Sequence, residues 1–275
     1  MSEPFLVLGA TGRIGQAMRR HAPLDGLDAV WQSRLPSPGY LAWDILAGRC
    51  PEGTAAGVVM CLAGVIHGTA AELALNTDLA LAACSTAQAF GAPHVFLASS
   101  AAVYGPSGRA VPEDAALAPP GAYGEAKRAM EQAVRGVMPQ GRLTILRIGN
   151  IAGFDTLLGG LRPGVPARLD PVEGQAGGPI RSYIGPVTLA QVLSQLASLA
   201  AQGAALPSVL NIGAGAVAMG DLLDAAGAEW TFGPKNPKAI PRVELDITCL
   251  QNLVDLPPDA GQAATMVAEW RRWRA

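Results

Sequence analysis

The sequence has 275 residues, half of them hydrophobic, so it is long enough to bury one large domain or a core with a smaller lobe. Its formal net charge of −2 offers no basic face, so no nucleic-acid partner is expected. The longest apolar run, residues 57–66, is too short to cross a bilayer, so no membrane partner is expected either. No basic leader precedes the first apolar residues, which predicts a cytoplasmic protein. The cysteines and histidines lack ligand spacing, so we expect reduced core thiols and no metal site.

A short apolar strand, residues 5–8, leads into three regularly spaced glycines. Gly9 permits a tight turn, Gly12 lets phosphates approach the backbone, and Gly15 lets the following helix lie close to the strand. Free amide groups and the positive end of the helix dipole at such a turn can hold a pyrophosphate. We therefore expect a dinucleotide site here, which also includes Thr11, Arg13 and Ile14.

The end of a second predicted strand, residues 28–34, decides which nicotinamide cofactor is expected. In an NAD-binding unit this position carries an acidic residue for the ribose 2′-hydroxyl. Ser33 and Arg34 stand there instead, and they would bind a 2′-phosphate that a carboxylate would repel. This predicts NADP as the preferred cofactor, with Arg13 as a second cation and NAD as the alternative. The competing interpretation makes Arg34 a solvated loop residue.

Two further strands are predicted to border the same site. The first covers residues 41–45 and ends at Asp44 and Ile45, where Asp44 either accepts the adenine amino group or caps a turn. The second is the apolar run 57–64, which suits a parallel strand covered on both faces. Its last residues would let a cofactor pass close to the backbone, namely Leu62, Ala63 and Gly64.

Strands and helices alternate through the first half of the chain. An Ala/Leu-rich helix over residues 71–90 precedes a strand over residues 94–100, which ends in Ser99 and Ser100. This alternation predicts an α/β fold, a Rossmann-type doubly wound parallel sheet.

Tyr123 and Lys127 are four residues apart on a predicted helix, so both side chains lie on one side of it. An ammonium held close favours the phenolate and lowers the pKa of the tyrosine toward the working range. The remaining lysine donors can bind ribose hydroxyls of a nicotinamide cofactor, and a nearby serine completes a proton-transfer site. The pair alone is a weak signal. Its weight comes from its place after the glycine turn and the strand that ends in serines.

Three motifs together resemble those of the extended short-chain dehydrogenase/reductases, the NAD(P)-dependent epimerase/dehydratase family. They are Gly-Ala-Thr-Gly-Arg-Ile-Gly at 9–15, Ser-Ser-Ala-Ala-Val-Tyr-Gly at 99–105 and Tyr-Gly-Glu-Ala-Lys at 123–127. The resemblance implies that Ser100 is the catalytic hydroxyl, with Ser99 as its neighbour. It also implies that Tyr123 is the acid/base and Lys127 its cationic partner.

The resemblance extends to the second half of the chain. Segment 147–153 is similar to one in which an asparagine contacts a substrate phosphate, which implies that role for Asn150. Segment 181–184 resembles Arg-Asp-Tyr-Ile, which suggests that Arg181 binds a diphosphate. The competing interpretation is that Arg181 bridges the two lobes and that Asn150 satisfies a turn. We accordingly expect a dinucleotide-binding domain over residues 1–150, to which 183–215 return. A small C-terminal substrate lobe would comprise residues 151–182 and 216–275.

Departures from the family pattern restrict the set of reactions that we expect. The 4,6-dehydratases carry an acidic pair after the catalytic hydroxyl, and this chain has Ala101 and Ala102, so dehydration is not expected. The chain is also short for a UDP-sugar epimerase, which favours a smaller or different substrate.

The residues therefore predict hydride transfer at a carbonyl or carbinol carbon, as an epimerase or a reductase of a nucleotide sugar or related compound. The alternatives are a reductase of a non-sugar carbonyl and a non-catalytic NAD(P)-binding sensor. Ala126, Met130 and Ala133 on the Tyr123 helix would allow a homodimer, although core packing explains them equally. Glu125 and Glu131 are expected to be solvated.

Overall fold

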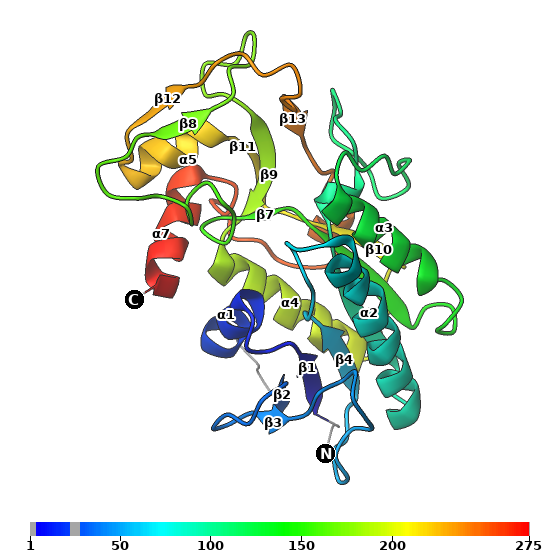
Figure 1. The fold of residues 1–275 in the computed structure, drawn as a ribbon. Coiled ribbons are helices and arrows are strands. Elements are labelled where there is room, and N and C mark those ends of the chain that lie inside the picture. Colours follow the sequence, from blue (N-terminus) through cyan, green and yellow to red (C-terminus); the bar gives the residue numbers. More distant parts are fainter. Residues whose placement is uncertain (1–3, 23–27, 275) are drawn as a thin grey trace.

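The structure is a computed structural model and describes residues 4–22 and 28–274. Its centre is a sheet of seven strands, all of them parallel to their neighbours: β1 (Phe5–Leu8), β2 (Ala29–Ser33), β3 (Leu41–Ala42), β4 (Val58–Cys61), β5 (His94–Ser100), β6 (Leu143–Ile148) and β10 (Val209–Ile212). The strands lie in the order β10-β6-β5-β4-β1-β2-β3 (Figure 1). This order reverses at β1, which pairs with β4 on one side and β2 on the other.

Helices cover both faces of the central sheet, as Figure 1 shows. They are α1 (Arg13–His21) and α4 (Pro186–Ala201) on one face, and α2 (Ala70–Phe90) and α3 (Ala122–Ala133) on the other. Each layer has its own apolar core, with Met18 and Leu193 in the first and Cys84 and Met130 in the second. The fold is therefore the doubly wound α/β sheet that the alternating pattern predicts. In such sheets ligands bind at the carboxyl ends of the strands, where the strand order reverses.

The remaining strands form two smaller sheets beyond the carboxyl ends of the central strands (Figure 1). One sheet contains β7 (Asn150–Ile151), β9 (Ile180–Ile184), β11 (Gly215–Ala218) and β13 (Arg242–Val243), and the other β8 (Ala167–Leu169) and β12 (Trp230–Phe232). They are accompanied by α5 (Met219–Ala226), α6 (Thr248–Gln251) and α7 (Ala263–Arg274). A third apolar core, which includes Tyr183 and Trp270, fills this part of the molecule.

A carboxylate joins this second part to the central sheet. Glu269 of α7 is buried, and it accepts hydrogen bonds from the backbone amides of Val187 and Thr188 at 2.9 and 2.8 Å. These amides belong to the first turn of α4, where the helix has no side-chain cap of its own. A carboxylate at this position is also favoured by the helix dipole. Glu269 thereby fixes α7 against α4.

Three predicted strands are shorter in the structure, and those expected over 28–34 and 57–64 become β2 and β4. The strand expected over 41–45 is only two residues long, and the chain then turns at Asp44. The helix that carries Tyr123 ends at Ala133, and Gly136, with a positive φ of 77°, lies in the turn before β6. Residues 1–3, on which the expectation of no basic leader partly rests, lie outside the described residues. No helix among the described residues is long and apolar enough to cross a membrane.

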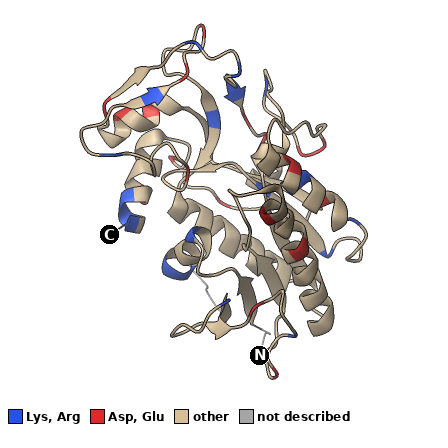
Figure 2. Cartoon of the chain, in the orientation of Figure 1, with Lys and Arg blue, Asp and Glu red and all other residues tan. Residues whose placement is uncertain are grey.

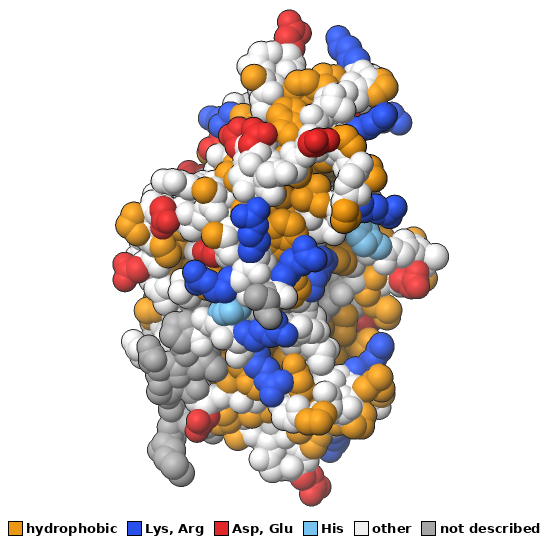
Figure 3. All heavy atoms as spheres, turned by 90° about the vertical axis from the view of Figure 1, so that its left-hand side faces the viewer, with side chains coloured by type: hydrophobic (Ala, Val, Ile, Leu, Met, Phe, Trp, Pro, Cys, Tyr) orange, Lys and Arg blue, Asp and Glu red, His pale blue; other side chains and the backbone are white. Residues whose placement is uncertain are grey.

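The charges are distributed less evenly than the composition suggests. Arginines gather in the last turns of α1 and α7 (Figure 2), and they form a basic area on that face of the molecule (Figure 3). Arg20 joins the two helices by donating to the backbone oxygen of Trp273 at 3.1 Å. The expectation of no basic face is therefore wrong for the area formed by the last turns of α1 and α7. Cations are favoured at the carboxyl ends of helices, whatever the net charge of the protein.

The cysteines are free, as expected, but only two of them are buried core thiols. Burial raises the pKa of both Cys61 and Cys84 to about 11, so these thiols stay protonated. Cys249 is exposed and Cys50 is half-buried, so the expectation of four core thiols is wrong for these two. Among the described residues no group of three or more potential ligands could hold a metal ion.

Candidate active site

The turn between β1 and α1 is built by close backbone contacts. Gly9 has a φ of +77°, and a Cβ there would lie 2.5 Å from the backbone nitrogen of Ala63. A Cβ on Gly15 would lie 2.5 Å from the Cα of Ala10, so α1 can approach the turn only because Gly15 has no side chain. Gly12 is the N-cap of α1 and makes no side-chain cap, which leaves the first helical amides free for a ligand.

A cleft of about 540 Å³ opens above this turn at the carboxyl ends of the central strands. Most of the predicted cofactor and catalytic residues line it: Thr11, Gly12, Arg13, Ile14, Gly15, Leu62, Gly64, Ser99, Ser100, Tyr123, Lys127 and Asn150. A Cβ on Gly64 would lie 3.3 Å from the Lys127 Nζ and 2.9 Å from the Asn76 Oδ1, so a side chain at this position would crowd both residues. The sequence therefore predicted residues that the fold brings together from α1, β5, α3 and β7 and from the segments that follow β1 and β4.

Other predicted cofactor residues lie outside this lining. Gly9 and Ala63 support the turn from below, and Ile45 is buried. The Asp44 carboxylate accepts a hydrogen bond from the Leu46 amide at 3.1 Å, which is the turn-capping alternative. The Ser33 hydroxyl donates to the backbone oxygen of Leu35 at 2.6 Å, at the end of β2. Arg34 follows it and is exposed.

Ser100 and Tyr123 meet at the junction of β5 and α3. The Ser100 hydroxyl accepts the Ala102 amide at 3.2 Å, so its own proton remains available to a partner. Burial raises the pKa of Tyr123, and a side-chain hydrogen bond with Ser100 lowers it by less. This net direction is opposite to the lowering that the Tyr-Lys spacing predicts, because burial of the phenol outweighs its stabilising contacts.

Lys127 lies beneath the cleft with only 4% of its surface exposed. Its ammonium donates to the backbone oxygen of Ala98 at 2.8 Å. Burial lowers its pKa to about 8, and Cys61 and Glu131 oppose that change. A buried lysine with spare donors at this depth suits a ligand with hydroxyl groups.

Asn76 of α2 is a cleft residue that the sequence analysis missed. It is 1% exposed, its Oδ1 accepts the Val65 amide at 3.2 Å, and its Nδ2 donates to the Val65 oxygen at 2.9 Å. It therefore holds the backbone that follows β4 in place along the cleft. The signal in the sequence is an amide between Leu73 and Ala80, on an otherwise apolar helix face.

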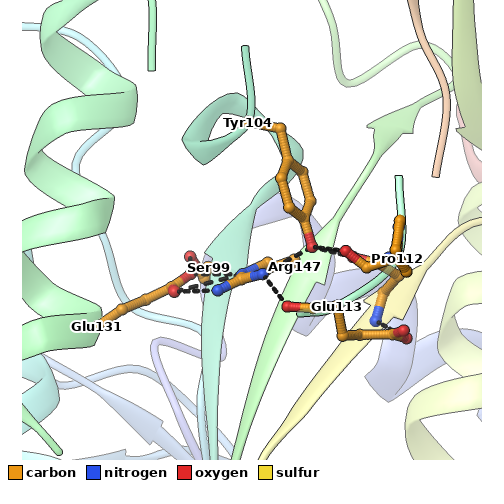
Figure 4. A network of polar contacts seen from close by, with 7 residues as sticks. Ser99, Tyr104, Pro112, Glu113, Glu131 and Arg147 are labelled. Atoms are coloured by element: carbon orange, nitrogen blue, oxygen red, sulfur yellow. Dashed lines mark hydrogen bonds and ion pairs between the residues drawn. The ribbon is translucent and has the colours of Figure 1, made fainter. Parts of the chain in front are cut away.

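A buried ion pair contacts β5, the strand that ends in Ser99 and Ser100 (Figure 4). The Arg147 guanidinium on β6 donates to the Glu131 carboxylate of α3 from Nη2 at 2.8 Å and from Nε at 3.1 Å. Ser99 donates to the same carboxylate at 2.6 Å, and Arg147 also donates to the Tyr104 hydroxyl at 2.7 Å. The expectation that Glu131 is solvated is therefore wrong.

Glu125 on the same helix is solvated, as predicted. Its carboxylate is exposed and pairs with Arg128 at 2.7 Å. The two glutamates differ because Glu131 lies one helical turn after Lys127, on the buried face of α3.

A second compartment of about 700 Å³ adjoins the cleft and shares Ser100, Tyr123 and Asn150 with it. Arg181 lines this compartment, and its two terminal nitrogens donate to the backbone oxygens of Ile180 and Ile240, each at 2.8 Å. Burial lowers its pKa, although the group stays cationic. Arg13 also lines both spaces, with its guanidinium 5.4 Å from the centre of the Phe154 ring.

Asp155 lines both compartments and was not anticipated from the sequence. Its Oδ2 accepts the Tyr183 hydroxyl at 2.7 Å and its Oδ1 accepts the Leu158 amide at 3.2 Å. Burial raises the pKa of Asp155, and these hydrogen bonds oppose the change. A carboxylate thus stands on the wall that faces Ser100 and Tyr123.

Several solved structures have this fold. MoeE5 in complex with UDP-glucose and NAD is 21% identical, with a TM-score of 0.76 over 99% of this chain and 100% of that chain. The NAD dependent NDP-hexosamine 5,6-dehydratase TunA is 19% identical, with a TM-score of 0.77 over 99% of each chain. UDP-glucose-4-epimerase from Stenotrophomonas maltophila, with bound NAD and formylated UDP-arabinopyranose, is 20% identical, with a TM-score of 0.77 over 98% of each chain. No curated protein matches the sequence.

The sequence itself matches one family over more than half of its length. Residues 5–156 match the NAD dependent epimerase/dehydratase family. The matched stretch contains the glycine turn, the serine strand and the helix with Tyr123 and Lys127. The chain belongs to the NAD dependent epimerase/dehydratase family.

Proposed function

We propose that the protein is an NAD(P)-dependent oxidoreductase or epimerase that acts on a carbon–oxygen bond of a nucleotide sugar or a related small carbonyl compound. The observation that carries this proposal is the convergence of Ser100, Tyr123 and Lys127 on one cleft above an uncapped helix start. Family membership supports it, and so do the nucleotide sugars and NAD named with the similar structures.

The cleft fits a dinucleotide. Gly12 is open toward it, since its Cβ would meet only the Gly9 oxygen, at 3.2 Å, and the helical amides beside it have no cap. In our proposal these amides hold the pyrophosphate, and Lys127 donates to the ribose hydroxyls. The bound nicotinamide would supply hydride chemistry at the substrate carbon. We propose NADP as the preferred form because Ser33 and Arg34 stand where an acidic residue would favour NAD.

The proton is handled by this chain's own side chains. Tyr123 would donate its phenolic proton to the substrate oxygen or accept a proton from it, and Ser100 would hold that oxygen by a hydrogen bond. The Lys127 ammonium would compensate the charge that develops on the phenol. A positioned acid/base of this kind contributes roughly 10² to 10⁴ in rate.

The second compartment is the proposed substrate site, and it is lined both by residues of the proposed dinucleotide-binding domain and by a proposed small lobe of residues 151–182 and 216–275. Arg181 and Arg13 would bind phosphate groups there, and Asn150 would contact the substrate. Ala101 and Ala102 line this compartment and carry no acid or base. We therefore propose epimerisation or reduction, and not 4,6-dehydration.

The proposal is tested first by ligand binding. The melting temperature should rise with NADPH, and rise further when a UDP-, GDP- or dTDP-sugar is added. If the cofactor stabilises the protein and no nucleotide sugar does, a non-nucleotide carbonyl compound becomes the better substrate. If neither NADPH nor NADH stabilises it, the proposal is wrong.

Replacing the phenol distinguishes an enzyme from a non-catalytic sensor. Tyr123→Phe should bind the cofactor as before and lose turnover of the stabilising substrate by at least a hundredfold. Tyr40→Phe is the matched control, because Tyr40 packs under Arg19, away from the cleft. Equal turnover in Tyr123→Phe and the unchanged protein would rule out Tyr123 as the acid/base, and a lack of turnover in both would favour the sensor.

A further inference from the structure

A separate cavity of about 560 Å³ lies away from the cleft and the second compartment, and none of its described lining residues lines either of them. Three segments enclose it: the turn 161–165, the segment 226–229 at the end of α5, and the carboxyl-terminal half of α7. Its volume is within the range of about 300–1,000 Å³ that is usual for small-molecule sites. The cavity is therefore large enough for a ligand of its own.

Three arginines from two of these segments line the cavity, namely Arg162, Arg271 and Arg274. Arg162 begins a tight turn in which Pro163 is followed by Gly164 at a φ of +70°. A hydrogen bond of 3.2 Å from the Val165 amide to the Arg162 oxygen closes this turn. A well-formed turn thus brings one arginine to the cavity, and a helix brings the other two.

Contacts within the protein already hold two of the arginines. The Arg271 Nη2 donates to the backbone oxygen of Ala226 at 3.0 Å. This oxygen belongs to the last turn of α5, where backbone carbonyls lack partners within the helix. The Arg274 guanidinium lies 5.3 Å from the centre of the Trp270 ring, which is a cation–π contact. Neither guanidinium has a further hydrogen-bond partner among the described residues, so both keep donors for a ligand.

The charges around the cavity do not balance. None of the three arginines forms an ion pair with a described residue, and Glu229 is the only acidic residue in the described lining. Three positive charges and one negative charge leave an excess of two positive charges. A phosphate monoester carries a charge of about −1.5 to −2 at pH 7, and arginine binds its oxygens through paired hydrogen bonds. A single carboxylate would compensate only half of the excess.

The rest of the lining favours a ligand that is partly apolar. The apolar side chain of Val165 is 61% exposed, and Leu161 lines the cavity with it. A ligand that covered them would remove apolar surface from water. Trp270 is 6% exposed, and a Cβ on Gly153 would lie 1.9 Å from its Cδ1. Because Gly153 lines the second compartment, Trp270 borders both the cavity and the wall of the proposed substrate site.

We propose that this cavity binds a small phosphate monoester that carries an apolar group. Arg162, Arg271 and Arg274 would bind the phosphate, and Leu161 and Val165 would cover the apolar group. The inference does not depend on the proposed function, because the described linings of this cavity and of the two compartments have no residue in common.

The Trp270 indole can report on binding of phenyl phosphate, the probe. In protein labelled with nitrogen-15 tryptophan, its indole N–H signal is the one that disappears in Trp270→Phe. Phenyl phosphate should shift this signal until the site is saturated, with a dissociation constant below about 1 mM. Arg271→Gln should raise the constant at least tenfold, because a charge-assisted hydrogen bond is lost. Arg272→Gln is the matched control, since Arg272 is exposed on the same helix and lies outside the cavity lining.

The proposal is wrong if the signal does not move, or if Arg271→Gln and Arg272→Gln bind the probe equally well. If loss of the Ala226 contact prevents folding, Arg162→Gln on the separate turn replaces Arg271→Gln, and an unchanged constant there overturns the proposal as well. Arg181→Gln should leave the constant unchanged. A weaker constant in that variant would place the probe in the second compartment and overturn the proposal.

Three further probes decide the chemistry of the ligand. Inorganic phosphate has the charge without an apolar group, benzoate has the ring with a single charge, and benzyl alcohol has the ring without a charge. Each should bind at least tenfold more weakly than phenyl phosphate. Equal affinity for inorganic phosphate would overturn the role of the apolar group. Equal affinity for benzoate or benzyl alcohol would overturn the choice of a phosphate.

Discussion

Glu131 and Arg147 form an ion pair in which the carboxylate is 0% exposed and the guanidinium 2% exposed. Two of the nitrogens of Arg147 contact the carboxylate, and the third interacts with the Tyr104 hydroxyl (Figure 4). The pair ties the helix that carries Tyr123 and Lys127 to strand β6 and, through Ser99, to β5. Burial of a charge is costly unless every partner is present, so this pair makes the arrangement of the site sensitive to either residue.

Removing the buried charge of Glu131 should therefore lower the stability of the folded protein. Glu131→Gln should lower the free energy of unfolding by about 3–5 kcal/mol, because Arg147 keeps a buried and uncompensated charge. Glu125→Gln on the same helix loses only an exposed pair with Arg128 and should cost less than about 1 kcal/mol. Urea unfolding of the two variants measures the difference, and equal losses would contradict a structural role for the buried pair.

Substitutions at two glycines of the turn after β1 should affect different properties, stability in one case and cofactor binding in the other. Gly15→Ala places a Cβ 2.5 Å from Ala10 and should reduce stability by about 2 kcal/mol, because the backbone must move. Gly12→Ala meets only the Gly9 oxygen at 3.2 Å, so its stability should change little. Its affinity for NADPH should fall about tenfold, because the methyl group occupies the space of the phosphates. Thermal unfolding and NADPH titration distinguish the two effects, and an unaltered affinity in Gly12→Ala would argue against this phosphate position.

His94 should make stability depend on pH. The imidazole is 3% exposed and its Nε2 lies 3.0 Å from the Thr144 hydroxyl, and burial lowers its pKa from 6.5 to about 4. The unfolded chain therefore binds a proton more readily than the folded chain between these values. The stability is fully present above pH 6.5 and falls by about 3 kcal/mol as the pH drops toward 4. Urea unfolding between these limits should show a smaller loss in His94→Gln, and an identical loss would refute the assignment. His67→Gln, at an exposed position, is the control.

Lys127 should set the alkaline limit of activity. Burial lowers its pKa to about 8, so the ammonium loses its proton, and its support for Tyr123, as the pH rises through that value. Turnover of the unchanged protein should decline above about pH 8. Lys127→Arg keeps its charge at all accessible pH values, so its remaining activity should not decline in the same range. The dependence of turnover on pH is measured for both proteins. If turnover declines above about pH 8 in Lys127→Arg just as in the unchanged protein, Lys127 is not the cause of the decline.

The end of β2 should control the choice of cofactor. Ser33→Asp restores a carboxylate that attracts a ribose 2′-hydroxyl and repels a 2′-phosphate, so it should weaken NADPH binding at least tenfold relative to NADH. Arg34→Ala should weaken NADPH binding and leave NADH binding unchanged. Fluorescence titrations with both nucleotides measure these ratios. If the unchanged protein binds NADH as tightly as NADPH, the preference for NADP is wrong.

The sequence indicated those features that depend on local spacing. The glycine turn, the alternation of strands and helices, and the Tyr123–Lys127 pair are each contained within a few residues, so their patterns survive in the linear chain. Glu131 could have been recognised by its spacing from Lys127, but its partner Arg147 lies on a different strand. Likewise, Asp155 gains its position only when β7 pairs with β9. The balance between burial and charge that raises the pKa of Tyr123 is a property of the folded environment, and no pattern in the sequence contains it.

The attachment of α7 to α4 through Glu269 bears on the route by which ligands enter and leave. Swinging the second part of the molecule away from the central sheet would break the attachment of α7 to α4 and leave two amides and a negative charge without partners. We therefore expect the two parts to stay attached while ligands come and go. Exchange must then pass over the rim of the two compartments, and the surface loops there govern how fast a product departs.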